Sequence, residues 1–210
     1  MRKLIASILT SLFLGAGPAC PKVVALGDSV TIGNPYTLAD PWPNKLSALL
    51  PVHMRVDNYA VSGQTVIEVY NSQYVAQVQG NGFTVVLILA GVNDLIASDS
   101  GLQAFNRLKT MTDAIEAEGH TPVVGTVTPW KAYGFWSSAK QTQTEDLNSR
   151  IRAWGNGSTR FVVDLYTAME SSTGSQTLAA SYDGGDGLHP SNAGAAKIAA
   201  MFRSVFWFGG

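Results

Sequence analysis

Short apolar runs of strand length alternate with longer helical patterns along most of this chain, and this alternation constrains the fold most strongly. The expected strands are residues 22–27, 53–60, 84–91, 121–128 and 160–166. The expected helices are residues 43–50, 66–78, 102–117, 142–154 and 192–206. The first, third and fourth strands are apolar on successive residues, which is typical of parallel strands buried on both faces. The sequence therefore predicts an α/β fold in three layers, with an open, doubly wound sheet of five parallel strands flanked by helices.

The N-terminal segment differs from the rest of the chain. Two basic residues precede an apolar run from Leu4 to Leu14, and small residues follow, which is typical of a secretory signal peptide. The run is too short to span a bilayer as a helix, so no stable membrane span is expected. The sequence predicts a signal peptide over residues 1–19, a single domain over residues 20–210, and a secreted or periplasmic protein. Lipid anchoring at Cys20, the only cysteine, is the alternative.

Composition excludes several classes of protein. Charged residues make up 14% of the chain and the formal net charge is −1, which argues against a nucleic-acid partner. A single cysteine and three scattered histidines provide neither a thiolate cluster nor a zinc site, so no metal is expected. Nothing in the pattern indicates a particular oligomeric state.

In an open parallel sheet, functional residues gather at the carboxyl ends of the strands. Ser29 follows the first expected strand in "GDSVTIG", Gly63 follows the second in "VSGQT", and Asn93 follows the third in "GVND". Each has a simpler interpretation, because serine caps helices, glycine forms turns and an Asn-Asp pair caps the next segment. The sequence contains no G-x-S-x-G motif. An asparagine amide is nevertheless a neutral donor that can face a developing negative oxygen.

The last loop, "YDGGDGLHPSNAG", contains a histidine among glycines. Asp186 precedes His189 by three residues, so its carboxylate can accept the imidazole Nδ1–H and leave Nε2 free to take a proton from a hydroxyl. Pro190 and Ser191 begin the last expected helix and give the imidazole a stiff support. Asp183, six residues before the histidine, is the less favourable alternative to Asp186.

Four blocks, "GDSV", "VSGQT", "GVND" and "DGLHPS", occur in this order between Gly27 and Ser191. In this the chain resembles the SGNH hydrolases, also called GDSL esterases and lipases. It departs from the first motif only in having Val30 where the family name implies leucine. The resemblance implies a flavodoxin-like sheet. Asp28 and Asp94 also match motif positions, and we expect them to brace loops by hydrogen bonds and to take no part in catalysis.

The resemblance also implies a role for each matching residue. Ser29 is the expected nucleophile, His189 the general base and acid, and Asp186 the orienting carboxylate. The backbone N–H groups of Ser29 and Gly63 and the side-chain amide of Asn93 are the expected oxyanion hole. The implied reaction is transfer of an acyl group from an ester to water through an acyl-enzyme, and it needs no metal and no organic cofactor.

Aromatic residues follow the first and fourth expected strands, in "NPYTLADPWP" and "TPWKAYGFWSS". As a cluster beside the proposed triad, they predict the wall of a substrate cleft. The cluster consists of Tyr36, Trp42, Trp130, Tyr133, Phe135 and Trp136. Of these, the expected substrate-binding residues are Trp42, Trp130, Tyr133 and Trp136.

Mostly short loops leave little room for a lid, which favours short acyl groups such as acetyl on a small-molecule or polysaccharide ester. A lysophospholipase or thioesterase acting on longer acyl chains is the alternative. A non-catalytic carbohydrate-binding module on the same fold is less favoured, because all catalytic positions are present. A flavodoxin-type cofactor protein is disfavoured, because "GDSVTIG" lacks a phosphate-cradling run of small donors.

Overall fold

The computed structural model describes residues 21–52 and 54–206. Five strands form one sheet in the order β2-β1-β3-β4-β5, and every neighbouring pair is parallel. The strands are β1 (Val23–Gly27), β2 (Val56–Asn58), β3 (Val85–Leu89), β4 (Thr121–Gly125) and β5 (Phe161–Val163). The predicted doubly wound α/β fold is therefore confirmed. The expected signal peptide and Cys20 lie outside the described residues.

Alternation of side chains along the strands explains their continuous apolar runs. In β1, Val24 and Leu26 point into one hydrophobic cluster, whereas Val23 and Ala25 point into a second cluster on the opposite face. Strand β3 divides in the same way between the two clusters. Because successive strand residues face opposite sides of a sheet, a strand covered on both sides needs apolar residues at every position.

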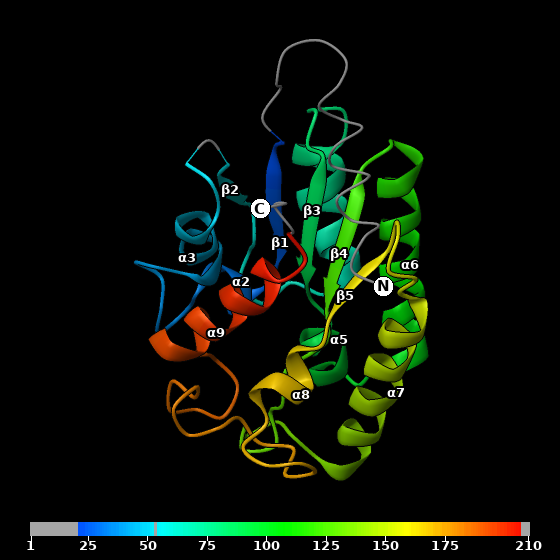
Figure 1. Cartoon of the computed structure of the whole chain (residues 1–210). Helices are drawn as coiled ribbons and strands as arrows, with labels where there is room; N and C mark the ends of the chain where they lie inside the picture. Colours follow the sequence, from blue (N-terminus) through cyan, green and yellow to red (C-terminus); the bar gives the residue numbers. More distant parts are fainter. Residues whose placement is uncertain (1–20, 53, 207–210) are drawn as a thin grey trace.

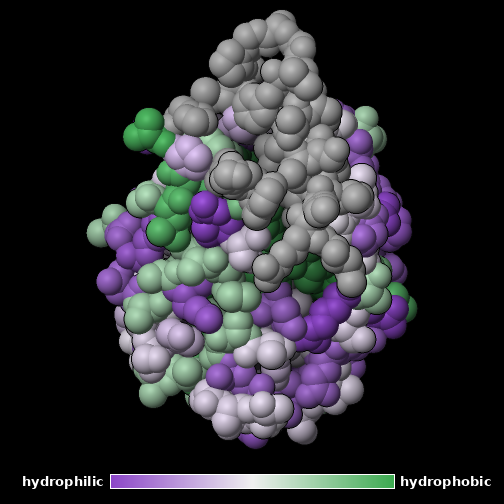
Figure 2. Space-filling model, in the orientation of Figure 1, coloured by the Kyte–Doolittle hydropathy of each residue, from purple (hydrophilic) through white to green (hydrophobic). Residues whose placement is uncertain are grey.

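Helices cover both faces of the sheet (Figure 1). The second cluster includes residues of α3 (Trp42–Leu49), α8 (Leu165–Met169) and α9 (Asn192–Arg203). The first cluster includes residues of α4 (Val66–Glu68), the π-helix η1 (Val69–Val78), α5 (Val92–Ile96), α6 (Gly101–Ala117) and α7 (Ser138–Trp154). The remaining helix, α2 (Ser29–Ile32), directly follows β1. Over the part of the α3 and α9 face that the grey atoms leave visible, hydrophilic and hydrophobic residues are interspersed (Figure 2).

The structure differs from the sequence prediction mainly in the short elements. Helices α2, α5 and α8 have only four or five residues, too few to show a helical period in the sequence. The expected helix over residues 66–78 begins as α4 and continues as a π-helix. Strand β2 lies at the sheet edge and pairs with its one neighbour, β1, over only three residues. No helix among the described residues is both long and apolar enough to cross a membrane.

Candidate active site

Ser29 is the first residue of α2, immediately beyond the carboxyl end of β1. The chain can turn sharply here because Gly27 has no side chain, and a Cβ at this position would overlap the carbonyl oxygen of Leu89. Asp28 caps the helix, since its Oδ1 accepts a hydrogen bond from the Val30 N–H at 3.0 Å. This strand, turn and helix hold Ser29 at the edge formed by the carboxyl ends of the strands, with 6% of its surface exposed.

The imidazole of His189 contacts Ser29 from a loop 160 residues later in the chain. Its Nε2 lies 2.9 Å from the Ser29 Oγ, and its Nδ1 lies 2.7 Å from the Asp186 Oδ2. The other carboxylate oxygen, Oδ1, accepts the backbone N–H groups of Leu188 and His189. The three side chains thus form a continuous chain of hydrogen bonds from carboxylate to hydroxyl.

Asp186 is held in its ionised form. Partial burial favours its neutral form, but the hydrogen bonds from the His189 backbone and ring and from the Leu188 N–H outweigh burial and lower the pKa of Asp186. A carboxylate that accepts the Nδ1–H fixes the tautomer and leaves Nε2 as the proton acceptor toward Ser29.

Asp183, the alternative orienting carboxylate, has a different environment. Its Oδ1 accepts the backbone N–H groups of Gly185 and Gly187, and the Gly184 N–H donates to the carbonyl of His189. These bonds close the loop on itself. Of the two aspartates, the structure brings only Asp186 into hydrogen-bond contact with the imidazole.

The expected oxyanion donors come from the ends of three strands. Within residues 21–52 and 54–206, the backbone N–H groups of Ser29 and Gly63 have no hydrogen-bond acceptor, so each is free to donate to a bound group. The Asn93 Nδ2 donates to the Gln64 carbonyl at 3.0 Å and to the Asp28 Oδ2 at 3.3 Å. These bonds join the loop that carries Gly63 to the turn that carries Ser29.

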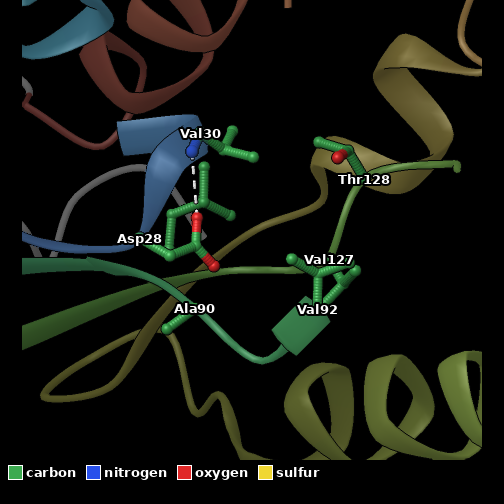
Figure 3. A pocket seen from close by; sticks show the side chains of 7 residues that line it. Asp28, Val30, Ala90, Val92, Val127 and Thr128 are labelled. Carbon is green, nitrogen blue, oxygen red and sulfur yellow. Dashed lines mark hydrogen bonds between the residues drawn. The ribbon is translucent and has the colours of Figure 1, made fainter. Parts of the chain in front are cut away.

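Asp28 is buried beside the nucleophile. Asp28 lines a small cavity of about 10 Å³ together with apolar side chains that include Val30, Val92 and Val127 (Figure 3). Burial raises the pKa of Asp28 to about 7, because the low-dielectric surroundings oppose its ionisation. The Val30 N–H opposes this rise, and the nearby charge of Asp94 adds to it.

Asp94 connects three helices around the same edge. Its Oδ2 accepts the Val66 N–H at the start of α4, and its Oδ1 lies 2.8 Å from Nη1 of Arg107 on α6. Burial raises the pKa of Asp94, while these two bonds partly offset that rise. Asp28 and Asp94 both accept hydrogen bonds that brace the edge, and neither contacts His189 in the described residues.

The structure corrects the prediction for two of the aromatic residues. Trp42 and Trp130 are each 0% exposed and belong to the two hydrophobic clusters, so neither lines an open cleft. Trp42 stacks on Phe202 of α9, with ring centroids 4.5 Å apart. Trp130 donates its indole N–H to the Thr144 Oγ1 on α7. Both side chains fill the interior because their large apolar rings gain more from burial than from solvent contact.

Other aromatic rings do surround the imidazole. The rings of Tyr36 and Tyr133 meet the His189 ring edge-on, with centroids 6.4 and 6.2 Å from it. Phe135, beside Tyr133, is 63% exposed. Trp136 is partly buried and donates its indole N–H to Gln141. Tyr133 and Trp136 therefore stay candidates for substrate contact, as do Tyr36 and Phe135 from the same expected cluster.

Two glutamines at this edge were not selected from the sequence. Gln64 accepts the Asn93 amide through its backbone carbonyl, and the buried Gln73 bonds to both Gln64 and Gly27. One signal for Gln73 was present, because it interrupts the apolar stripe of the helix over residues 66–78 with a polar residue. No group of three or more potential metal-ligating residues occurs within the described ranges.

Comparisons with known proteins agree with this arrangement. Residues 25–197 match the model of the GDSL-like lipase/acylhydrolase family. No curated protein matches the chain significantly. Among solved structures, a protein assigned to the lipolytic G-D-S-L family from Desulfitobacterium hafniense has a TM-score of 0.75 at 21% identity, over 89% of this chain and 100% of that one. A GDSL-like lipase from Bacteroides thetaiotaomicron has a TM-score of 0.74 at 21% identity, over 95% of each chain. A lipase/acylhydrolase from Enterococcus faecalis has a TM-score of 0.67 at 22% identity, over 89% of this chain and 95% of that one.

Proposed function

Because this chain belongs to the GDSL-like lipase/acylhydrolase family and is a carboxylic ester hydrolase, we propose that it cleaves esters through Ser29, His189 and Asp186. The observation that supports this assignment most directly is the 2.9 Å contact between the His189 Nε2 and the Ser29 Oγ. A serine hydroxyl is a weak nucleophile at neutral pH, and an adjacent base activates it.

The proposed reaction has two halves. Ser29 attacks the ester carbonyl while the His189 Nε2 accepts its proton, and Asp186 stabilises the resulting imidazolium. The negative oxygen of the tetrahedral intermediate accepts hydrogen bonds from the Ser29 and Gly63 N–H groups and from the Asn93 amide, which gives up its longer bond to the Asp28 Oδ2 and keeps its bond to the Gln64 carbonyl. His189 then protonates the leaving alcohol. In the second half, water attacks the acyl-enzyme with His189 again as the base, releasing the acid and restoring Ser29.

For the substrate, we propose a short acyl group, such as acetyl, on a bulky alcohol that includes carbohydrate. Tyr36 and Tyr133 beside the imidazole, and the exposed Phe135 beside Tyr133, support this proposal. Aromatic rings of this kind suit contact with the apolar face of a sugar or a similar flat group. Longer acyl chains, as in lysophospholipids or thioesters, are the alternative substrates. The composition of residues 1–19 supports export of the enzyme to the periplasm or the medium.

Replacing the nucleophile tests the proposed function. We expect Ser29→Ala to lose hydrolysis of p-nitrophenyl acetate and butyrate to about 10⁻⁴ or less of the wild-type kcat, with an unchanged melting temperature. Ser204→Ala at the end of α9 is the matched control, because its hydroxyl bonds only to its own helix end, and it should keep full activity. Full turnover by Ser29→Ala would show that another group is the nucleophile.

Substrate range needs a second measurement with the wild-type enzyme. A series of p-nitrophenyl esters of increasing acyl length, tested beside acetylated xylan and a lysophospholipid, separates the two substrate classes. The proposal predicts that kcat/KM falls with acyl length and that acetate is released from the xylan. A rise in kcat/KM toward long acyl chains would favour the lysophospholipase alternative.

A further inference from the structure

Gln73 places a fully buried amide directly behind the nucleophile turn. Its surface is 0% exposed, although it lies on a helix with one solvent-facing side. Its Oε1 accepts the Gly27 N–H at 2.9 Å, and its Nε2 donates to the Gly27 carbonyl at 2.7 Å. The same Nε2 donates to the Gln64 Oε1, also at 2.7 Å. The amide therefore bonds to both polar groups of one peptide residue and to a second side chain.

The geometry of the helix accounts for this position. In η1 the Gln79 N–H bonds to the Tyr74 carbonyl, five residues back, as in a π-helix. This wider turn buries Gln73 and Tyr74 side by side, with Val69 and Val78 on the same face. Burying an amide without partners costs roughly 1–3 kcal/mol, so a glutamine in an apolar stripe is tolerated only because the turn supplies its hydrogen bonds.

The partners of Gln73 lie next to the proposed oxyanion donors. Gly27 is two residues before Ser29, and Gln64 follows Gly63 directly. The Gln64 carbonyl also accepts the amide of Asn93. One buried side chain thus connects the backbone that carries the first two donors, and through Gln64 it is connected to the third.

We propose that Gln73 is a positioning residue for the oxyanion hole. It does not touch the substrate. It fixes the Gly27 and Gln64 segments relative to each other, so that the N–H groups of Ser29 and Gly63 and the Asn93 amide keep their alignment during the reaction. The inference rests on the proposed function, since it assigns Gln73 a role in stabilising the tetrahedral intermediate. Preorganised donors of this kind lose much of their effect when they are displaced by about 1 Å.

The fold contains a matched control for this role. Asn148 on α7 is 1% exposed and holds Val127 in the same two-bond manner, accepting its N–H at 2.9 Å and donating to its carbonyl at 3.0 Å. Its partner Val127 lies beyond the end of β4, and within the described residues neither Val127 nor Asn148 hydrogen-bonds to a proposed oxyanion donor. Loss of Asn148 should therefore have the structural cost of losing Gln73 without its cost in catalysis.

The first test compares Gln73→Met with Asn148→Leu, using melting temperature, kcat and KM for p-nitrophenyl acetate. We expect both variants to lose several degrees in melting temperature. Gln73→Met should lose about 10- to 100-fold in kcat with KM within about 3-fold, whereas Asn148→Leu should keep kcat within about 3-fold. Binding of a phenylboronic acid, which forms a tetrahedral anion on a serine, should weaken in parallel with the loss of kcat. Equal kcat in the two variants would overturn the proposal.

A double-mutant cycle with Asn93→Ala gives the second test. If Gln73 acts through the oxyanion donors, the double variant should be only about 2- to 5-fold slower than Asn93→Ala alone. Fully multiplicative losses would mean that Gln73 does not act through the Asn93 amide and would overturn the proposed link to this third donor. Gln64→Ala removes the part-buried link to Gln73 and the exposed hydrogen bonds between Gln64 and Ser72, so it should fold and lose about 3- to 10-fold in kcat, even if Gln73→Met does not fold.

These outcomes are separate from those that decide the proposed function. If Ser29→Ala is inactive while Gln73→Met and Gln64→Ala keep wild-type kcat, the nucleophile assignment stands and the positioning role fails. If Ser29→Ala keeps its turnover, the proposed function fails first.

Discussion

The proposed active site lies at the carboxyl ends of the strands (the catalytic edge) and has two halves that are built in opposite ways. The histidine side is the loop that carries Asp186 and His189, and the serine side is the turn that carries Ser29 together with the residues packed behind it. On the histidine side, Asp183 and Asp186 bond to groups that are two to four residues away in the sequence. On the serine side, the bonds from Asn93 to Gln64 and Asp28 and from Gln73 to Gly27 join residues that are 29 to 65 positions away from each other in the sequence. Only the bond between Gln73 and Gln64 is shorter in sequence separation. One side is a loop that supports itself, and the other is part of the sheet and its core.

Burial follows the same division. The Asp186 side chain is 27% exposed, whereas Asp28 beside the nucleophile is 1% exposed. A substitution in the histidine loop should therefore affect activity more than stability. A substitution behind the nucleophile should affect both, because it removes a buried polar group or leaves its partners without one.

Among the variants that test this comparison, the largest expected effect comes from replacing the orienting carboxylate on the histidine side. Asp186→Asn keeps the shape of the side chain but replaces a carboxylate, which only accepts hydrogen bonds, with an amide that can also donate to Nδ1. The imidazole is then no longer held in the tautomer that leaves Nε2 free to accept the Ser29 proton. We expect kcat to fall by about 10³- to 10⁴-fold, as for triads of this type, with a melting temperature within a few degrees of the wild type. Steady-state kinetics and thermal unfolding measure the two quantities.

Asp183→Asn is the matched control for that variant, three residues earlier in the same loop. It weakens the two bonds that Asp183 accepts from Gly185 and Gly187, but leaves the contact between Asp186 and the imidazole in place. A loss of about 10-fold or less is expected, because the loop is only loosened. If Asp183→Asn proved the more damaging of the two, the aspartate assignment would have to be reversed.

The local construction of the histidine side explains why the sequence alone could describe it. Asp186 and His189 are close enough in the chain for spacing to suggest their pairing, and the glycines indicate a tight loop. The parallel strands were also predictable, because burial on both faces leaves continuous apolar runs. Their predicted ends extended beyond the observed ends by up to three residues, since an apolar run does not show where its neighbour stops pairing.

The remaining features depend on contacts that no local pattern records. Trp42 was expected in a cleft because it follows the nucleophile turn, but its ring stacks on Phe202, which lies 160 residues away in the sequence. The π-turn that buries Gln73 cannot be distinguished from an ordinary helix by apolar spacing alone. Asp28 and Asp94 were expected as braces only because they match family motifs, and their buried partners became visible only in the folded chain.

The second prediction concerns stability on the serine side as a function of pH. The pKa of Asp28 is raised from 3.8 to about 7 by burial, so between these values the folded state holds a proton that the unfolded state releases. Stability from neutral Asp28 is therefore present at low pH and is lost as pH rises from about 4 to about 7. Relative to Asp28→Asn, which has no titrating group, the wild type should lose on the order of a few kcal/mol over this range.

Urea unfolding of both proteins at several pH values measures this difference. Asp57→Asn, on the exposed side of β2, controls for the loss of one carboxylate from the chain. A wild-type stability that runs parallel to that of Asp28→Asn from pH 4 to pH 7 would show that the buried carboxyl titrates as an exposed one does. It would also mean that the deeper burial of the serine side has no effect on how stability depends on pH.

The smallest expected effect lies where the histidine loop meets the aromatic rings. Gly184 has an ordinary backbone conformation, but an added Cβ would overlap the Tyr36 ring, which is 48% exposed and can swing outward into solvent. Gly184→Ala should therefore cost less than about 1 kcal/mol in stability while moving one of the two rings beside His189.

Gly134→Ala is the matched control, since its added Cβ would meet open space next to Tyr133. If Tyr36 contacts the alcohol of the substrate, Gly184→Ala should raise KM for bulky esters about 3- to 10-fold and leave p-nitrophenyl acetate nearly unchanged, because a lost apolar contact is worth about 1 kcal/mol. Equal KM changes for large and small esters would mean that the loop affects catalysis only through the histidine.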